Sequence, residues 1–135
     1  MPEIIAACKQ HGIELVKTNY LKKDTSLKAV IKSIKKRSPE LVLVGGGDGT
    51  ISDAVDFFAG SSMEVGVLPL GTTNNFARSL GMPLEINAAI ASIRNGKVSM
   101  IDLGKIHDEY FVNVVGIGIS AQIAKNVTDH QKKKF

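Results

Sequence analysis

Two glycine-rich stretches, each directly after a short apolar run, carry the residues of this sequence that are suited to chemistry. The first is VGGGDGT at residues 44–50, and the second is PLGTTNN at residues 69–75. Each precedes a segment with apolar residues at helical spacing, so each loop is expected to open a helix. The first main-chain amides of a helix have no partner inside it, and they readily bind anions. These residues therefore indicate a site for phosphate groups.

The two loops are expected at one edge of one sheet. The apolar runs at 41–44 and 65–68 are typical of strands buried on both faces, which predicts an α/β fold with helices above and below a parallel sheet. Parallel strands deliver their loops to the same edge, where open α/β sheets bind ligands. The free amides of 46–50 and 71–74 would then surround one polyphosphate. The candidate contacts are Gly46, Gly47, Asp48, Gly49, Thr50, Gly71, Thr72, Thr73 and Asn74.

Neither loop matches the common nucleotide-binding patterns. A Walker loop needs a lysine before its Ser or Thr, and neither loop has that lysine. The dinucleotide fingerprint needs a third glycine and an acidic residue that binds the ribose at the end of the next strand, and this sequence has neither at the required position. Without a loop lysine, phosphate charge has to be met by amides, hydroxyls and a divalent cation. Asp48 is the expected side chain for that cation, through water, or else it is a turn or cap residue. The threonines and Asn74 are either helix caps or phosphate donors.

The remaining pattern predicts further elements around these loops. Helices are expected over 2–10, after the cap residues 24–26, over 76–80, and from Pro83 to Gly96. A strand is expected at Ile13–Lys17, and a hairpin of strands 98–106 and 110–115 turns at 107–109. A last helix is expected over 120–127. The domains are then 1–97, the α/β part, and 98–135, the start of a β-rich second domain with a connecting helix.

Composition narrows the class of protein. The chain has 135 residues, enough for one domain with a core, and its net charge of +4 is too weak to argue nucleic-acid binding. The single cysteine, Cys8, fits a reducing compartment. No apolar run is long enough to cross a bilayer, so a cytoplasmic protein is expected. A basic face at Lys28, Lys32, Lys35, Lys36 and Arg37 is either solvated or attracted to anionic lipid headgroups.

At this point the sequence resembles a known family. VGGGDGT followed by GVLPLGTTNNFARSLG resembles the catalytic domain of the diacylglycerol kinases, which includes sphingosine kinases and bacterial lipid kinases. IDLGKI and YFVNVVGIGISAQI resemble that family's passage into its second domain. GGDGT is shared with NAD kinases, whereas PLGTTNNFAR is specific to the lipid kinases. The resemblance covers nearly the whole chain.

The resemblance implies ATP-dependent phosphorylation of a lipid hydroxyl with Mg²⁺. It places ATP phosphates at Gly47, Asp48, Gly49 and Thr50 and at Thr72 or Thr73, and it suggests Thr18 as another nucleotide contact. One departure is Ile51-Ser52-Asp53, where the family has a hydrophobic residue followed by Asn-Glu. The family also has an earlier strand and a longer β-rich domain holding the general base. A truncated product, inactive alone and self-associating through its C-terminal strands, is therefore expected.

Two rival functions stay open. One is an NAD kinase-like enzyme, which TTNNFAR disfavours. The other is a non-catalytic module that senses a nucleotide with the same sheet edge.

Overall fold

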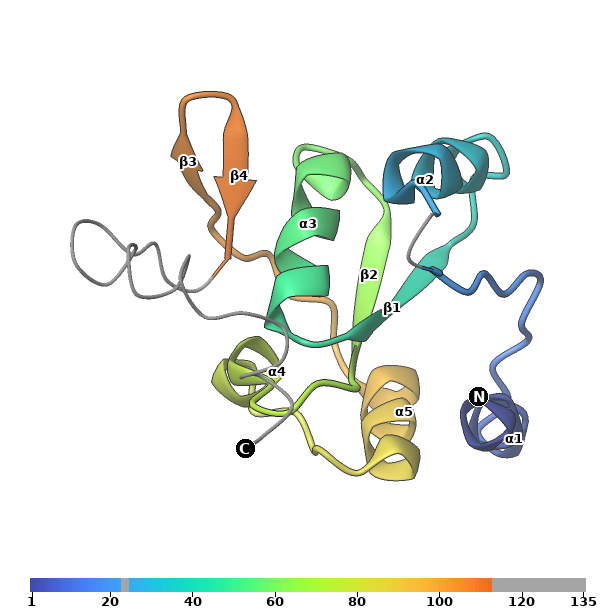
Figure 1. Ribbon diagram of the computed structural model, residues 1–135. Helices are drawn as coiled ribbons and strands as arrows, with labels where there is room; N and C mark the ends of the chain where they lie inside the picture. Colours follow the sequence, from blue (N-terminus) through green and yellow to red (C-terminus); the bar gives the residue numbers. More distant parts are fainter. Residues whose placement is uncertain (23–24, 113–135) are drawn as a thin grey trace.

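The computed structural model describes residues 1–22 and 25–112 of the chain. Helices precede, separate and follow the first two strands, and the last two strands form a separate hairpin (Figure 1). In chain order the elements are α1 (Pro2–Gln10), α2 (Leu27–Lys35), β1 (Leu41–Gly46), α3 (Asp48–Phe58), β2 (Glu64–Pro69), α4 (Asn75–Ser79), α5 (Ile86–Asn95), β3 (Gly104–Ile106) and β4 (Glu109–Phe111).

The two expected apolar strands pair as a parallel ladder. β1 and β2 run in register from Leu41 opposite Glu64 to Gly46 opposite Pro69. Both strands therefore end at the same edge of the sheet, which confirms the arrangement inferred from the sequence. Each strand also extends beyond its apolar run, so that Gly46 and Pro69 belong to the ladder itself.

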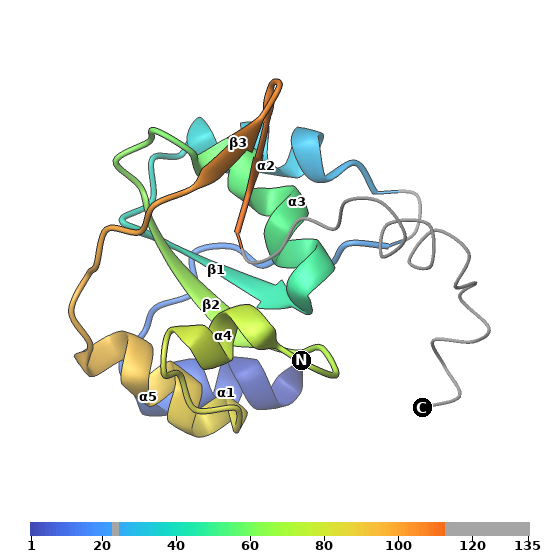
Figure 2. The same ribbon diagram turned by 90° about the vertical axis from the view of Figure 1, so that its left-hand side faces the viewer.

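Helices pack on both faces of this sheet. Neighbouring strand residues point to opposite faces, so Leu43 and Leu68 join a core cluster with α1 and α5, while Val44 and Val67 join one with α3 and α4. Figure 2 shows α2 and α3 on one side of the strands and α1 and α5 on the other. The α/β class is thus confirmed. A complete three-layer open sheet and a β-rich second domain stay predictions.

Local capping explains where the helices begin and end. Ser26 caps α2 by accepting a hydrogen bond from the Ala29 amide at 3.3 Å. The helix expected from Pro83 begins instead at Ile86, because the Glu85 carboxylate accepts bonds from the Asn87 and Ala88 amides at 2.8 and 2.7 Å. Gly12, with a φ of +69°, follows α1, where a left-handed residue without a side chain commonly ends a helix.

The strand expected at Ile13–Lys17 is wrong. Residues 13–22 form neither a helix nor a strand, although Ile13 and Leu15 pack into the same cluster as Leu43. Val16 is 79% exposed. Ile13 and Leu15 are half-buried, but a strand also needs a neighbouring backbone for its ladder, and the described residues pair none with this segment.

The hairpin is confirmed but is shorter than expected. β3 and β4 are antiparallel over three residues each, and the turn is His107-Asp108, with Glu109 already in β4. His107 takes a φ of +54°, as tight hairpin turns require. Residues 98–103 are not a strand. The rest of the expected strand 110–115 beyond Val112, and the helix over 120–127, lie outside the described residues.

The hairpin is fastened to α3. The Tyr110 amide donates to Asp56 Oδ1 at 2.5 Å, and Val112 is only 9% exposed because it joins the cluster that includes Ile51 of α3. The chain therefore covers Val112 itself, and this part of the segment gives no support to self-association. Self-association through residues 113–119 and the domain division at residue 97 are not tested by these contacts and stay predictions.

Candidate functional site

The two glycine-rich loops meet backbone to backbone at the carboxyl edge of the sheet. The Leu70 amide donates to the Gly46 carbonyl at 3.2 Å. A Cβ atom added to Gly71 would lie 2.4 Å from the Cα of Gly47, far inside contact distance. Only glycine fits there, because any side chain would push the two main chains apart. The close approach of the loops expected from the sequence is therefore present. We call residues 46–50 and 70–74 together the rim.

The amino end of α3 supplies the unbonded amides of the rim. Gly47 is its cap residue, in extended backbone, and its carbonyl accepts the Ile51 amide at 3.1 Å. Among the described residues, no acceptor engages the amides of Gly49 and Thr50. Gly49 is exposed, with no atom within 4 Å of an added Cβ. These features fit an anion held at a helix start.

Asp48 bridges the two loops. Its Oδ2 accepts the Asn75 amide at 3.0 Å and its Oδ1 accepts the Phe76 amide at 2.9 Å. A carboxylate at a helix start satisfies free amides and complements the helix dipole. Asp48 therefore caps α4 from 27 residues away in the sequence. Of the free amides expected at 71–74, that of Gly71 is not free, because it donates to Asn74 Oδ1 at 2.8 Å. The next amides along the chain that are engaged, those of Asn75 and Phe76, are the ones that Asp48 accepts.

Asn74 braces its own loop. The residue is 7% exposed and takes a left-handed conformation, with φ 49° and ψ 45°. Its Oδ1 accepts the Gly71 amide at 2.8 Å, and its Nδ2 donates to the carbonyls of Gly71 at 2.8 Å and of Pro69 at 3.4 Å. With its amide group engaged on both sides, Asn74 holds the turn that presents Thr72 and Thr73.

The threonines divide into exposed and packed positions. Thr72 and Thr73 are exposed on the outer side of their loop. Thr50 lies in the first turn of α3 and packs so closely on Gly46 that a Cβ at Gly46 would meet the Thr50 Cβ at 2.5 Å. Thr18 is exposed in the irregular segment, and among the described residues no hydrogen bond joins it to the rim. The structure thus brings together every expected site residue except Thr18.

Sequence reasoning missed Arg78. Its Nε donates to the Thr73 carbonyl at 2.9 Å, so its guanidinium group lies against the second loop. Helical side chains lean toward the amino end of their helix, which carries a residue of the first turns of α4 back over the preceding loop. An arginine four residues after Asn74, in a short helix opened by the loop, was the available signal.

The described residues offer little to a cation on their own. They contain no group of three or more His, Cys, Asp or Glu side chains that could hold a metal ion. Asp48 is the one carboxylate in the rim sequence. Mg²⁺ is commonly held by one or two carboxylates together with substrate phosphates and water. The donor set therefore fits Mg²⁺ carried by a polyphosphate and does not fit a closed protein site.

Other titratable groups are structural. Burial raises the pKa of the Cys8 thiol, which is fully buried between α1 and the sheet. The hydrogen bonds from the Asn87 and Ala88 amides lower the pKa of the Glu85 carboxyl. His11 Nε2 lies 2.6 Å from Asn87 Oδ1 and ties α1 to α5. His107 is in the hairpin turn, and His130 lies outside the described residues.

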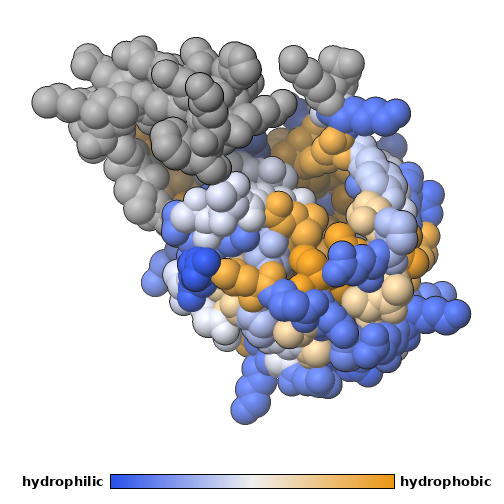
Figure 3. Space-filling model, turned by 60° about the horizontal axis from the view of Figure 1, so that its bottom comes forward, coloured by the Kyte–Doolittle hydropathy of each residue, from blue (hydrophilic) through white to orange (hydrophobic). Residues whose placement is uncertain are grey.

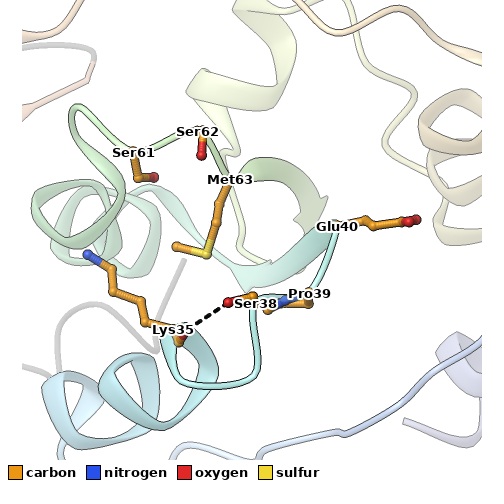
Figure 4. A pocket seen from close by; sticks show the side chains of 7 residues that line it. All are labelled: Lys35, Ser38, Pro39, Glu40, Ser61, Ser62 and Met63. Carbon is orange, nitrogen blue, oxygen red and sulfur yellow. Dashed lines mark hydrogen bonds between the residues drawn. The ribbon is translucent and has the colours of Figure 1, made fainter.

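Cavities occur elsewhere on the molecule. One of about 380 Å³ lies at the opposite, amino edge of the sheet, between the loops that lead into β1 and β2 (Figure 4). A second, of about 400 Å³, lies beside α1 and includes Ile5 and Leu15. Neither includes a residue of the rim. In Figure 4 Lys35 points toward Ser61 and Met63, whereas Glu40 points away from them. The rim is the better candidate because its groups are the ones that recognise phosphate.

The surface also carries apolar side chains. Figure 3 brings forward the lower side of Figure 1 and shows an apolar area surrounded by hydrophilic residues. Leu70 of the rim is 47% exposed, and Leu80 just beyond α4 is 42% exposed. Within the described ranges, every helix is too short or too polar to pass through a bilayer.

Comparison with known proteins agrees with this geometry. The model of the diacylglycerol kinase catalytic domain matches residues 1–106. A diacylglycerol kinase of Bacillus subtilis is 38% identical over 104 residues, which are 75% of this chain and 34% of that protein. One of Staphylococcus carnosus is 29% identical over 136 residues, 98% of this chain and 44% of that protein.

A third relative extends the comparison to another name. A probable YegS-like lipid kinase of Pseudomonas putida is 37% identical over 94 residues, 68% of this chain and 32% of that protein. The chain thus spans less than half the length of these three relatives. The matched region contains both rim loops and the helices that they open. On this match, the chain belongs to the diacylglycerol kinase catalytic domain family.

Proposed function

We propose that this chain is the nucleotide-binding part of a lipid kinase that transfers the γ-phosphate of ATP to a lipid hydroxyl. The observation that carries the proposal is the contact between Gly47 and Gly71 at the ends of two parallel strands. It sets the unbonded amides at the start of α3 beside the exposed hydroxyls of Thr72 and Thr73. A polyphosphate is the ligand class that such an arrangement recognises best.

In this proposal the two loops of the rim contact the nucleotide with different groups. The amides of Gly49 and Thr50 bind phosphate oxygens, and the hydroxyls of Thr72 and Thr73 donate to the same group from the other loop. Mg²⁺, when bound with ATP, neutralises charge on the phosphates during transfer. Asp48 orients water around that cation while it keeps α4 in place.

The acceptor side of the reaction belongs to the longer proteins. The chain spans under half the length of the relatives described above, so we propose that the general base and the recognition of the lipid lie outside this chain, and that the chain alone does not turn over. The diacylglycerol kinase names of two relatives favour a diacylglycerol-like acceptor. We further propose a cytoplasmic protein that meets its lipid at a membrane surface.

Calorimetric titration of the chain with ATP, with and without Mg²⁺, tests nucleotide binding directly. We expect binding that strengthens with Mg²⁺, and weaker binding of NAD⁺, which is the acceptor of an NAD kinase. Failure to bind any nucleotide at millimolar concentration would remove the proposal. A preference for NAD⁺ over ATP would replace it with the NAD kinase-like alternative.

Asp48→Asn in a longer protein that carries this domain tests catalysis. We expect lipid phosphorylation to fall by at least tenfold, since a positioned charge in phosphoryl transfer is worth that much or more. ATP binding should be retained, because the amides of α3 and the threonines remain. Asp53→Asn, an exposed carboxylate on the same helix, is the matched control and should leave turnover unchanged. Unchanged turnover in Asp48→Asn would show that Asp48 has no part in catalysis. A longer protein that binds ATP but phosphorylates no lipid even without the substitution would favour a non-catalytic nucleotide sensor.

A further inference from the structure

Arg78 is the one cationic residue in the two loops and the short helix α4. The segments 45–50 and 69–79 contain a single acid, Asp48, and a single base, Arg78. A bound polyphosphate would bring several negative charges to this place. Asp48 adds one more, so a cation of the protein close by would strengthen binding beyond what Mg²⁺ and the main-chain amides provide.

The structure fixes the head of Arg78 at the rim. Its Nε donates to the Thr73 carbonyl at 2.9 Å, which holds the planar group against the loop. Thr73 is two residues from Gly71, and two residues of chain span at most about 7 Å. Gly71 in turn contacts Gly47 at the start of α3. The guanidinium group is thus tied to the same cluster of backbone groups that forms the anion site.

The remaining donors of Arg78 are available to a ligand. Guanidinium has five N–H donors in a fixed fork, and only Nε is engaged by Thr73. No ion pair or further hydrogen bond within the described residues engages the two terminal nitrogens, and the side chain is exposed. A fork with one arm anchored is already oriented, which lowers the entropy lost when the other arms bind phosphate.

We propose that Arg78 binds the polyphosphate of the nucleotide and supplies the positive charge that the two lysine-free loops lack. This inference rests on the proposed function, because it takes ATP as the guest of the rim. The plainer role for Arg78 is structural, as a brace for the turn at Thr73 or as a charge that complements the end of α4.

Arg78→Gln, Arg78→Lys and the control Arg94→Gln separate these roles. Arg94 is an exposed arginine in the last turn of α5, so its replacement removes the same charge away from the rim. We expect Arg78→Gln to weaken Mg²⁺–ATP and inorganic tripolyphosphate binding about tenfold, as the loss of a charge-assisted hydrogen bond does. Arg78→Lys should recover part of this loss, and Arg94→Gln should behave as the unmodified chain.

Titrations with ATP, ADP and AMP separate a phosphate contact from a structural role, because a structural role would change the affinity for all three nucleotides equally. If Arg78 contacts a phosphate, the loss of affinity in Arg78→Gln should depend on the number of phosphates in the nucleotide. It should be larger for ATP or ADP than for AMP. An equal loss for all three together with a lower melting temperature would show a brace and overturn the inference. Binding of ATP by Arg78→Gln within twofold of the unmodified chain would overturn it as well.

The outcome for the unmodified chain distinguishes the two proposals. If that chain binds neither Mg²⁺–ATP nor tripolyphosphate, the proposed function fails and the role of Arg78 fails with it. If it binds both and Arg78→Gln binds them equally well, only the role of Arg78 fails.

Discussion

The two edges of the β1–β2 sheet are built in opposite ways. At the carboxyl edge the loops touch through glycine main chain, and side chains of Asp48 and Asn74 bond to amides of the neighbouring loop or turn. At the amino edge the loops stand apart and leave a cavity of about 380 Å³. The hydrogen bonds there are local, such as Ser38 Oγ to the Lys35 carbonyl at 3.4 Å and Ser61 Oγ to the Phe58 carbonyl at 2.8 Å.

This difference shows that the presence of a cavity and the presence of suitable ligand-binding groups are separate indications of a binding site. The amino edge has a cavity, but this cavity lies where the chain enters the strands and where α2 and α3 have just ended. Helix carboxyl ends carry partial negative charge and suit cations, so Lys35 is explained there as a complement to α2. The carboxyl edge presents the start of α3, glycines and hydroxyls, which together suit phosphate.

Gly71→Ala is expected to have the largest effect on ATP affinity, because it disrupts the contact between the two loops at the carboxyl edge. The added Cβ would meet the Cα of Gly47 at 2.4 Å, and neither main chain can yield without disturbing the ladder. We expect a loss of about 1–3 kcal/mol in the free energy of unfolding and a larger loss of ATP affinity. Chemical denaturation and calorimetry would measure both.

Gly49→Ala is the control for that change. Gly49 lies in the same rim, has open space around an added Cβ and is already in helix α3. Its replacement should leave stability unchanged or slightly improved. Equal damage from both variants would show that the contact between Gly47 and Gly71 is not the feature that matters.

Two substitutions of Asn74 distinguish the contribution of its left-handed backbone from that of its side-chain hydrogen bonds. Asn74→Ala removes three hydrogen bonds and also places alanine in a left-handed conformation, so we expect it to destabilise the fold by about 2–4 kcal/mol. Asn74→Gly removes the same bonds but accepts that conformation, and it should cost about 1 kcal/mol less. Thermal denaturation of the two variants side by side would show the difference. If the order is reversed, the left-handed backbone is not what selects this residue.

Glu85→Gln examines a cap of the ordinary local kind, in contrast to the long-range cap by Asp48. Since two amides lower the pKa of Glu85 in the folded chain, its contribution to stability is full above the usual carboxyl range near 4.5. That contribution is lost as pH falls through the lower, folded value. The melting temperature of Glu85→Gln should therefore lie below that of the unmodified chain at pH 7, and the gap should close in acid. A gap that stays constant with pH would contradict this account.

Lys35→Ala and Ser62→Ala at the amino edge should have the smallest effect. Both residues line the cavity in Figure 4 and both are exposed, so ATP affinity should stay within about twofold of the unmodified chain. Calorimetry under the conditions used for the rim variants gives a direct comparison. A tenfold loss here would show that the cavity takes part in binding after all.

Much of the fold could be predicted because local signals agreed with each other. The apolar runs of β1 and β2, the cap at Ser26 and the apolar positions of α3 all point to the structure that is observed. The strand at Ile13–Lys17 failed for a physical reason. The apolar residues of this segment indicate which side chains are buried. Pairing as a strand depends on a backbone elsewhere in the chain, and the local sequence carries no information about that backbone.

The candidate site was predicted in position but not in its internal bonding. The type and spacing of residues placed Asp48, Thr72 and Asn74 at one edge, as the structure has them. The bond of Asp48 to α4 spans 27 residues, and the inward turn of Asn74 depends on a left-handed backbone. Neither is encoded in a short motif. The same holds for Arg78, whose side chain folds back over the loop once α4 has formed.

The contacts of the hairpin with α3 connect the hairpin, through that helix, to the rim. Its eleven residues form a rod about 16 Å long, with Thr50 against Gly46 at one end and Asp56 holding the Tyr110 amide near the other. A short helix of this kind moves as a unit, since bending it would break several of its internal bonds. A pull on the hairpin would therefore tilt the amides of Gly49 and Thr50, which we propose to bind phosphate.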